Sequence, residues 1–420
     1  MQNSESVSEI PKAAPVKPIE RIIDLDVLRG IALFGILVVN LFLFANPIAI
    51  LATDTGMWTE WYNQSYLFFS RVFFEGKFIT MFSFLFGLGF YIFTERLKEK
   101  QLPVRLIFFR RMVLLFLFGM LHAWLFWAGD ILGFYALGGT ILMLFFLYRT
   151  DKTLKIWIGI IGGGFIVLFS LLVLFVIWGL SMPDVAPGIK EGFMEAGEEF
   201  KELFMRGLEV YATGSFSEMM TYRGEEIAFA WFGMMISPMG IPFIISIFLL
   251  GFLIGRKGLL DEPRLLRILL IPRRWKLFVP GLVLSILYAT SYIYADPVLW
   301  NGWTILQMVS IMLGAPLLML GYSGFILKWL DENKATNFLH QFAPVGRMAL
   351  TNYIMQTVIC TTIFYGYGLG LIGQFPPVYI LPLAIVIFAF QVYLSNWYFR
   401  KYKMGPLEKV WRMGTYWKFV

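Results

Sequence analysis

The strongest constraint on this chain is a series of apolar segments of about 20 residues each. A helix rises about 1.5 Å per residue, so a segment of this length crosses the hydrocarbon core of a bilayer. The sequence therefore predicts an all-α, polytopic integral membrane protein with about ten transmembrane helices. The expected spans cover residues 28–48, 75–95, 108–128, 131–149, 153–180, 233–256, 277–295, 304–327, 349–372 and 378–399.

Composition supports this class and excludes others. Hydrophobic residues make up 58% of the chain and charged residues 15%, against roughly 25% charged residues in a soluble protein. The net charge of +7 is attributed to Lys and Arg at the ends of the spans, not to a nucleic-acid surface. The single cysteine, Cys360, lies in an apolar run and cannot form an intramolecular disulfide.

The basic loops predict the orientation in the membrane. Lys and Arg gather after the second, fourth and sixth spans and in residues 400–420, whereas the long segment 181–225 is acidic. Basic loops stay in the cytoplasm, and an even number of spans with both termini cytoplasmic fits every loop. We expect a flexible cytoplasmic tail over 1–25, a transmembrane domain over 26–399 and a basic cytoplasmic tail over 400–420. Glutamates among apolar residues at helical spacing predict that 181–225 is an extracytoplasmic amphipathic segment.

Motifs for several common chemistries are missing from the sequence. There is no Walker-type GxxxxGK[ST], no GxSxG and no Cys/His cluster, so we expect no metal and no tightly bound cofactor. GLGLIG at 368–373 has the spacing GxGxxG but lies at the end of a span, without a preceding strand. Two GxxxG pairs, Gly159/Gly163 and Gly251/Gly255, allow close helix contact, either within the protein or in a homodimer.

Polar residues at membrane depth are the candidates for function. An ionised side chain in the bilayer costs several kcal/mol unless it is paired or hydrated. Asp26 and Arg29 are three residues apart on one helical face and can pair. Asn40 lies eleven residues beyond Arg29, which is about 16 Å deeper along the helix.

Polar residues also occur in later spans. Arg347 marks the cytoplasmic end of the ninth span, and Asn352 and Gln356 lie four residues apart on one helical face. Others lie at the outer ends of the second and sixth spans: Arg71, Glu75, Lys77, Arg223, Glu225 and Glu226.

His122 is one of only two histidines in the chain, and it lies in the largely apolar stretch LHAWLFWAGDIL. Arg110 and Arg111 mark the inner end of the same span, and His122 is about 18 Å from Arg110 along the helix. The sequence therefore predicts that Asn40 and His122 lie at similar depth, in the outer half of the membrane.

Asp130 is the nearest acidic residue to His122 in the sequence. On a straight helix the two would be about 12 Å apart, too far for contact. Gly129 suggests that the helix ends there, and a chain that folds back brings Asp130 to the imidazole, where a carboxylate fixes the tautomer and raises the basicity. In the alternative, His122 bonds to a neighbouring helix and Asp130 caps the next span.

Several segments together resemble the YeiB-like bacterial membrane proteins, which carry the domain of unknown function 418. These segments are IDLDVLRGIALFGILVVN, FEGKFITMFSFLFGLGF, FRRMVLLFLFGMLHAWLFWAGDILGFYALGG, IFLLGFLIGRKGLL, VGRMALTNYIMQTVI and GPLEKVWRMGTYW. The resemblance runs from Arg21 to Trp417 and implies a multi-pass protein of the bacterial cell membrane. That family has no firmly assigned reaction, so the resemblance leaves the function open.

A more distant resemblance concerns the first span. RGIALFGILVVN is similar to the first span of heparan-α-glucosaminide N-acetyltransferases, where RGxA is also followed by Asn at this spacing. It also looks like the first span of bacterial membrane O-acyltransferases, which have His at the position of Asn40. Asn cannot act as a base, so acyl transfer here requires another residue for proton transfer, and His122 is the candidate.

The residues and the resemblance together favour a membrane acyltransferase that uses a cytoplasmic acyl-CoA-type thioester and an extracytoplasmic glycan or lipid-linked acceptor. His122 acts as general base in this hypothesis, Asp130 orients it, and Asn40 polarises the thioester carbonyl. A transporter or flippase and a non-catalytic scaffold remain alternatives. The residues expected to bind substrate or donor are Asp26, Arg29, Arg110, Arg111, Arg347, Asn352 and Gln356.

Overall fold

The structure is a computed structural model that describes residues 22–53, 56–237, 239–296, 299–332 and 336–417. Within these ranges every regular element is a helix, which confirms the all-α class. The α-helices are α1 Ile23–Phe44, α2 Trp61–Phe73, α3 Lys77–Glu99, α4 Val104–Leu125, α5 Leu132–Ile141, α6 Asp151–Ile158, α7 Gly164–Leu180, α8 Ala186–Thr213, α9 Phe216–Ile236, α10 Ile241–Gly255, α11 Leu265–Leu270, α12 Arg274–Tyr294, α13 Gly302–Asp331, α14 Thr336–His340, α15 Phe342–Arg347, α16 Ala349–Phe364, α17 Ile380–Phe399 and α18 Pro406–Tyr416. Short 3-10 or π-helical segments are η2 Ile48–Ala52, η3 Leu142–Phe146, η4 Gly159–Gly163 and η5 Pro377–Tyr379.

Six helical segments within the described residues are long and apolar enough to cross a bilayer, so the chain is a helical membrane protein. They are α1, Trp61–Glu99, Asp151–Leu180, α12, α13 and Pro377–Phe399. A seventh crossing results if α9 and α10, which meet at a 60° bend, count as one span.

Each of the other expected spans also contains a helix. These helices are short or carry charged residues, and they are not among the six that are long and apolar enough to cross a membrane. The apolar helices Leu132–Phe146 and Ala349–Phe364 are short, α10 has 15 residues, and α4 carries three arginines in its first half. The number of ten crossings therefore stays a prediction.

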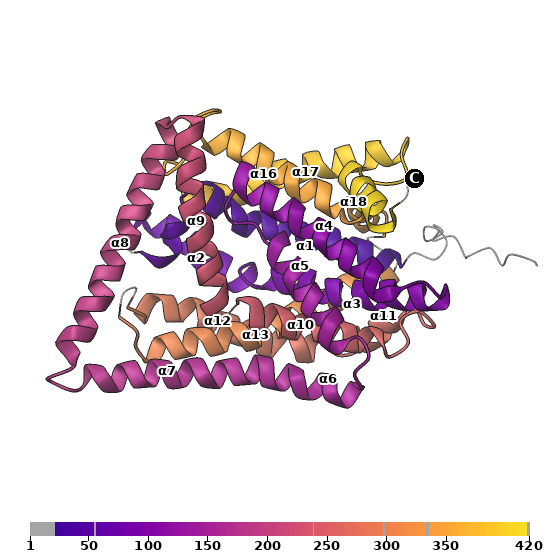
Figure 1. The fold of residues 1–420 in the computed structure, drawn as a ribbon, viewed down its shortest axis with the longest axis horizontal. Coiled ribbons are helices and arrows are strands. Elements are labelled where there is room, and N and C mark those ends of the chain that lie inside the picture. The colour runs from indigo at the N-terminus through magenta and orange to yellow at the C-terminus, as the bar shows by residue number, and fades with distance from the viewer. Residues whose placement is uncertain (1–21, 54–55, 238, 297–298, 333–335, 418–420) are drawn as a thin grey trace, which may run out of the picture.

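Helix α7 shows which surface faces lipid. Its sequence is apolar throughout, yet only 6% of the best 18-residue window of Asp151–Leu180 is buried. Leu168, Leu171, Phe175 and Trp178 are all more than half exposed. An exposed apolar surface of this size is stable only against lipid or another protein. Figure 1 shows α7 running along the edge of the bundle, roughly alongside α12 and α13.

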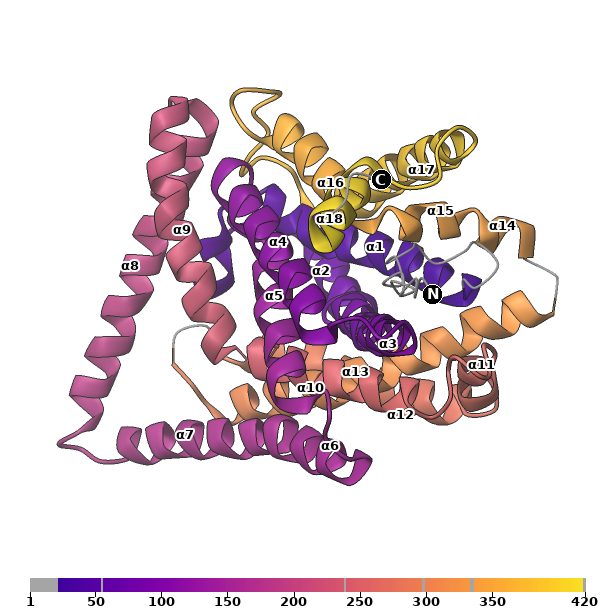
Figure 2. The same cartoon turned by 45° about the vertical axis from the view of Figure 1, so that its right-hand side comes forward.

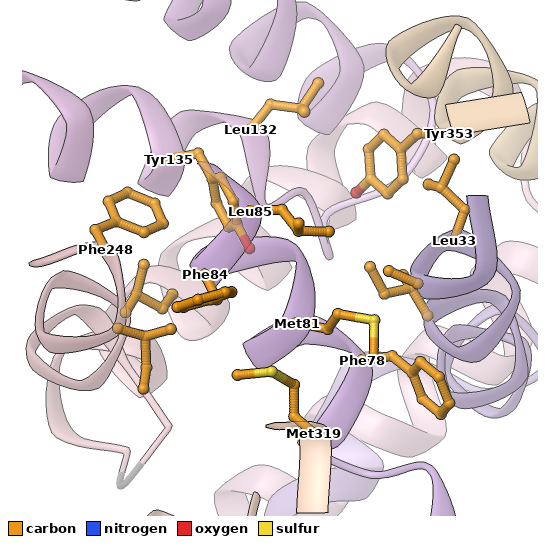
Figure 3. Close-up of a cluster of buried hydrophobic side chains, with 14 of the residues drawn as sticks. Leu33, Phe78, Met81, Phe84, Leu85, Leu132, Tyr135, Phe248, Met319 and Tyr353 are labelled. Atoms are coloured by element: carbon orange, nitrogen blue, oxygen red, sulfur yellow. The ribbon is translucent and has the colours of Figure 1, made fainter. Parts of the chain in front are cut away.

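The core lies where α1, α3, α5 and α10 meet. Phe78, Met81 and Phe84 of α3 occupy its centre, and Tyr135 of α5 and Phe248 of α10 close one side (Figure 3). Phe86 stacks on Phe248 with the ring centroids 4.4 Å apart. Aromatic side chains from α3, α5 and α10 therefore pack against one another on this side of the core.

Glycine brings α3 and α10 into backbone contact. A Cβ atom at Gly251 would meet the carbonyl oxygen of Phe84, and one at Gly255 would meet the ring of Tyr91. This GxxxG pair therefore serves packing inside the protein. A Cβ atom at Gly159 or Gly163 would meet nothing within 4 Å. The second GxxxG pair therefore does not pack inside the protein, and its use in a homodimer stays a prediction.

Basic segments meet at one end of the bundle, which we call the basic end. Arg267 of α11 forms two hydrogen bonds of 2.7 Å with Asp24 at the start of α1, and it also pairs with Asp331 at the end of α13. Arg256 after α10 pairs with Asp151 at the start of α6, with 3.2 Å between nitrogen and oxygen. These ion pairs join helix ends that are far apart in the sequence.

The opposite end is covered by α8, and we call it the α8 end. Figures 1 and 2 both show α8 crossing this end steeply, at a large angle to α7. Phe193 and Phe200 of α8 contact the rings of Trp300 and Phe229, while most of its glutamates are exposed. The helix is therefore amphipathic, with its apolar face on the bundle.

Substitution of the packed and the open glycines should affect stability differently. G251A should lower the unfolding free energy by about 1–3 kcal/mol, because the added methyl group forces α3 and α10 apart. G159A should be neutral or stabilise by up to about 1 kcal/mol, because Ala favours the helix and meets open space. Thermal unfolding of both variants in the same detergent measures this difference, and equal losses would contradict the assigned packing.

Candidate functional site

His122 and Asp130 are in direct contact. The distance between Nδ1 of His122 and Oδ1 of Asp130 is 2.9 Å, and both residues are buried. Helix α4 ends at Leu125, and the backbone N–H groups of Phe126 and Trp127 both donate to the carbonyl oxygen of His122. The chain then folds back, as the sequence suggests from Gly129, and Asp130 returns to the imidazole.

Asp130 also holds the start of the next helix. Its Oδ2 accepts a hydrogen bond of 2.8 Å from the backbone N–H of Gly133, in the first turn of α5. Asp130 therefore has both of the roles considered from the sequence, contact with His122 and capping of the next helix. One carboxylate oxygen binds His122, and the other accepts from an N–H group at the N-terminus of α5. Bonds to both oxygens fix the orientation of the carboxylate.

Thr357 of α16 completes this group on the other side of the ring. Its Oγ1 lies 2.9 Å from Nε2 of His122, and its side chain is fully buried. With the carboxylate of Asp130 accepting from Nδ1–H, Nε2 of the imidazole accepts a hydrogen bond from the Thr357 hydroxyl, whose oxygen also lies 3.4 Å from the Tyr353 carbonyl oxygen. We call His122, Asp130 and Thr357 the histidine group.

A pocket lies near the histidine group, toward the α8 end, and its lining contains none of the three residues of that group. Its volume is about 450 Å³, and it lies among the end of α4, the α8–α9 turn and the end of α16. Leu125 and Phe126 in its wall follow His122 by three and four residues, and Val358 in its wall follows Thr357 directly. The pocket is therefore about one helical turn from the histidine group. The remaining lining residues are Ala212, Thr213, Gly214, Phe216, Met219, Thr361, Thr362, Gly366 and Tyr367.

Two buried charges hold the elements around this pocket. Glu226 accepts hydrogen bonds of 2.6 Å from the Tyr211 hydroxyl and 2.7 Å from the backbone N–H of Ile48. Arg223 donates to the carbonyl oxygen of Trp124 at 2.9 Å, which satisfies a carbonyl in the last turn of α4. Sequence reasoning placed Arg223 and Glu226 at the outer end of a span but assigned them no partner.

Asn40 does not join the histidine group. It is half-buried on α1, and it is not among the hydrogen-bond partners of His122 in the described part of the chain. Gln356, which precedes Thr357, donates to the carbonyl oxygen of Leu33 at 3.4 Å. Asn40 is seven residues further along α1, about 10 Å nearer the α8 end. The structure therefore does not place Asn40 in contact with His122, and the role of Asn40 in polarising a thioester carbonyl stays a prediction.

Asn352 and Gln356 make hydrogen bonds between helices. Asn352 donates to Ser395 of α17 at 3.1 Å, and Gln356 donates to Gln391 of α17 at 2.9 Å. Gln391 in turn donates to the Asn352 carbonyl oxygen at 2.8 Å. These bonds attach α16 to α17, and the contact of Gln356 with Leu33 attaches it to α1. Both side chains therefore have a packing role in the bundle.

The arginines expected to bind the donor lie at the basic end, and each has a partner. Arg29 pairs with Asp26 at 3.0 Å. Arg111 stacks on the ring of Trp411 at 3.7 Å, and Arg110 lies 5.3 Å from the ring of Trp417. Other contacts hold Arg347, which lies 3.9 Å from the Phe399 ring and donates to the Lys403 carbonyl oxygen.

Helix α18 forms one wall beside these arginines. Trp411 donates from Nε1 to the Arg111 carbonyl oxygen at 2.9 Å, which fixes α18 on α4. Glu408 accepts from the backbone N–H of Thr351 at 3.0 Å and from its hydroxyl at 2.7 Å, which fixes α18 on the first turn of α16. Residues 406–416 of the expected C-terminal tail are thus a packed helix, and 418–420 lie outside the described residues.

Thr357 is the residue of the histidine group that sequence reasoning missed. It is 235 residues away from His122, and threonine is common in membrane helices, where its hydroxyl bonds to its own backbone. The signal available was its place directly after Gln356 in an apolar span. In the part of the chain described by the structure, no group of three His, Cys, Asp or Glu residues can hold a metal ion.

Fold and site together define a class: a helical membrane protein with a buried histidine–carboxylate pair, an arginine-rich end and a pocket near the other end. The match to a family model named "Protein of unknown function (DUF418)" covers residues 254–418. Uncharacterized protein YxaH of Bacillus subtilis (strain 168) is 34% identical over 94% of both chains. The chain therefore belongs to the DUF418 family.

Two further relatives extend this comparison. Uncharacterized protein YeiB of Escherichia coli (strain K12) is 28% identical over 94% of this chain and 96% of its own length. An uncharacterized 39.9 kDa protein in the amylase 3′ region of Bacillus acidopullulyticus is 28% identical over 96% of both chains. No solved structure matches the fold. These relatives confirm the resemblance to YeiB-like proteins, and their names state no reaction.

The contact of Glu408 with α16 predicts a dependence of stability on pH. Burial raises the pKa of Glu408 above its ordinary value, against the opposing hydrogen bonds from Thr351. Because the folded-state pKa exceeds the unfolded value of about 4.3, the contribution of this carboxyl to stability is largest at low pH and falls as pH rises through the folded pKa. The variant E408Q lacks this titration.

The measurement is the thermal unfolding midpoint of both proteins in detergent between about pH 4.5 and about pH 7.5. We expect the midpoint of the wild type to fall relative to that of E408Q as the pH rises. A parallel course of the two curves would contradict the assigned burial of Glu408.

Proposed function

We propose that this protein transfers an acyl group across the membrane, from an acyl-CoA-type donor at the basic end to an acceptor at the α8 end. The observation that carries the proposal is the contact of His122 with Asp130 and Thr357, placed between the arginines and the pocket. A neutral imidazole with one nitrogen on a carboxylate and the other on a hydroxyl is the arrangement that removes a proton from an alcohol.

In this proposal the residues of the histidine group have separate roles. His122 accepts a hydroxyl proton at Nε2 and later returns it to the leaving group. Asp130 keeps the proton of the neutral ring on Nδ1 and stabilises the imidazolium that forms. Because both residues are buried, little water competes for this proton or for the acyl group.

The donor would bind at the basic end through its phosphates. Arg29 and Arg111 are close enough for their charges to interact, and α18 packs beside them. Arginine binds phosphate through two parallel hydrogen bonds, and a ring stacked on one face leaves the edge of the guanidinium accessible. Arg110 is twelve residues from His122, about 18 Å along α4. The flexible arm of coenzyme A covers a comparable distance between its phosphates and its thioester.

The acceptor would bind in the pocket at the α8 end. Its walls are apolar and aromatic, with threonine hydroxyls from α8 and α16. Such a lining suits a molecule that has both an apolar part and hydroxyl groups. A glycan attached to lipid, or a lipid with a hydroxylated headgroup, has this chemistry.

The proposal includes the topology expected from the sequence. With ten crossings and both termini in the cytoplasm of a bacterium, the basic end faces the cytoplasm and α8 lies on the outer surface of the plasma membrane. The donor is then on the side where acyl-CoA is made, and the pocket opens toward the extracytoplasmic side.

The roles of the two ends predict different effects of substitution. R29Q and R111Q should weaken binding of acetyl-CoA by about 10-fold or more each, because each loses a charge-assisted contact. H122Q should bind acetyl-CoA like the wild type but release CoA roughly 10²–10⁴-fold more slowly. R273Q serves as a control, because Arg273 is exposed and, within the described residues, its side chain donates to the Leu269 carbonyl oxygen of the preceding turn and not to another side chain.

Binding is measured by titration of radiolabelled acetyl-CoA into protein in lipid nanodiscs, and turnover by CoA release with total bacterial lipid as acceptor. If R29Q and R111Q bind donor as well as R273Q does, the donor site is elsewhere. If H122Q releases CoA at the rate of the wild type, His122 is not the base.

A further inference from the structure

The base in the histidine group faces a hydroxyl of the protein itself. Nδ1 of His122 is occupied by Asp130 and Nε2 by the Oγ1 atom of Thr357, each at 2.9 Å. An imidazole has no third nitrogen, so an acceptor hydroxyl can reach the base only after Thr357 moves away. Thr357 is fully buried in the middle of α16, which leaves it little freedom to move.

A hydroxyl, an imidazole and a carboxylate in this order form the arrangement that activates a nucleophile. Serine is the usual hydroxyl in such a group, and threonine supplies the same oxygen with one added methyl group. We propose that Thr357 is the nucleophile and carries the acyl group as an ester between two half-reactions. This inference rests on the proposed acyl transfer and adds the residue that forms the covalent intermediate.

The two half-reactions balance without any further reactant. In the first, Oγ1 of Thr357 attacks the thioester carbonyl carbon, the C–S bond breaks, and an oxygen ester forms. His122 takes the hydroxyl proton at Nε2 and gives it to the departing thiolate, which leaves as CoA thiol. In the second, an acceptor hydroxyl attacks the ester carbonyl carbon, and His122 takes the proton of that hydroxyl. The ester bond to Oγ1 of Thr357 breaks, and His122 gives the proton to Oγ1.

The position of Thr357 explains why a covalent intermediate suits this fold. The arginines lie at the basic end, the pocket lies about one helical turn from the group toward the α8 end, and Thr357 lies between them. A direct transfer would require donor and acceptor to meet within the membrane. With an acyl group held on Thr357, each substrate approaches from its own side.

The group also has the rigidity that such a nucleophile needs. Asp130 is fixed through Gly133, and α16 is fixed through the bonds of Gln356 and Asn352 to α17. The ring of Tyr353 lies with its centroid 5.1 Å from that of the imidazole and restricts its rotation. Reacting atoms held at hydrogen-bond distance need little further ordering.

The test is a single-turnover labelling of the purified full-length protein with radiolabelled acetyl-CoA, and separately with palmitoyl-CoA, in lipid nanodiscs. After denaturation, the wild type should retain label in an ester that alkaline hydroxylamine cleaves. Mass spectrometry should place it on the peptide with Thr357. T357S should label within about 10-fold of the wild type, and T357V should label roughly 10³-fold less.

The control is T94V, in the same nanodiscs. Thr94 is also buried in a helix, but among the residues that the structure describes its hydroxyl bonds to carbonyl oxygens of its own helix and not to an imidazole, so T94V should label like the wild type. Thermal unfolding midpoints verify that T357V remains folded. Because T357S keeps the hydroxyl, its labelling separates a lost nucleophile from a damaged fold.

The failures of the two proposals are distinguishable. If the wild type releases CoA and acylates lipid, but T357V does so equally fast, acyl transfer stands and Thr357 is not the nucleophile. Label on a residue other than 357 would have the same meaning. If the wild type neither retains label nor releases CoA with either donor, the acyl transfer itself is wrong, and the intermediate with it.

Discussion

The contact between His122 and Asp130 is the interaction on which the rest of this structure depends. It closes the turn between α4 and α5, orients the carboxylate that starts α5, and sets the ring against Thr357 of α16. Three helices thus meet at one buried polar group. Removal of one partner leaves the others buried without a hydrogen bond, which costs about 1–3 kcal/mol per group. The same buried contact that holds the helices therefore fixes the orientation of the His122 imidazole inside the bundle.

The ion-paired arginines and the pocket lie toward opposite ends of the bundle. Ion pairs and stacked arginines gather at the basic end, whereas the pocket and the buried Glu226 lie toward the α8 end. Between them, amide side chains of α16 and α17 bond to each other and hold the helices in register. A non-catalytic scaffold would explain these amide side chains, because their hydrogen bonds join the neighbouring helices α16 and α17. A scaffold would not need the hydrogen bond between the His122 imidazole and the Thr357 hydroxyl near a pocket.

Much of the fold could be predicted from the sequence, since apolar runs specify membrane helices whatever their partners are. The fold-back after Gly129 was predictable too, because a glycine followed by an acidic residue marks a helix end. The short or bent helices α10 and α16 were not, because their ends depend on packing against distant segments. Thr357 was hidden for the same reason: only the tertiary fold brings α16 to α4. The similar depth of Asn40 and His122 agrees with the contact between the rings of Phe44 and Trp127, which follow them by four and five residues. Span lengths could not show that the Asn40 side chain is not a hydrogen-bond partner of His122 in the described residues.

In the proposed reaction, acyl groups enter at the basic end and leave at the α8 end, with His122 as the base. The most direct test uses proteoliposomes in which the protein has one known orientation, with radiolabelled acetyl-CoA supplied on one side at a time. We expect CoA release only when donor is on the side of α18, with label appearing in lipid-linked material on the opposite side, and neither event with H122Q. Donor consumption from the α8 side, or equal activity of H122Q, would contradict it.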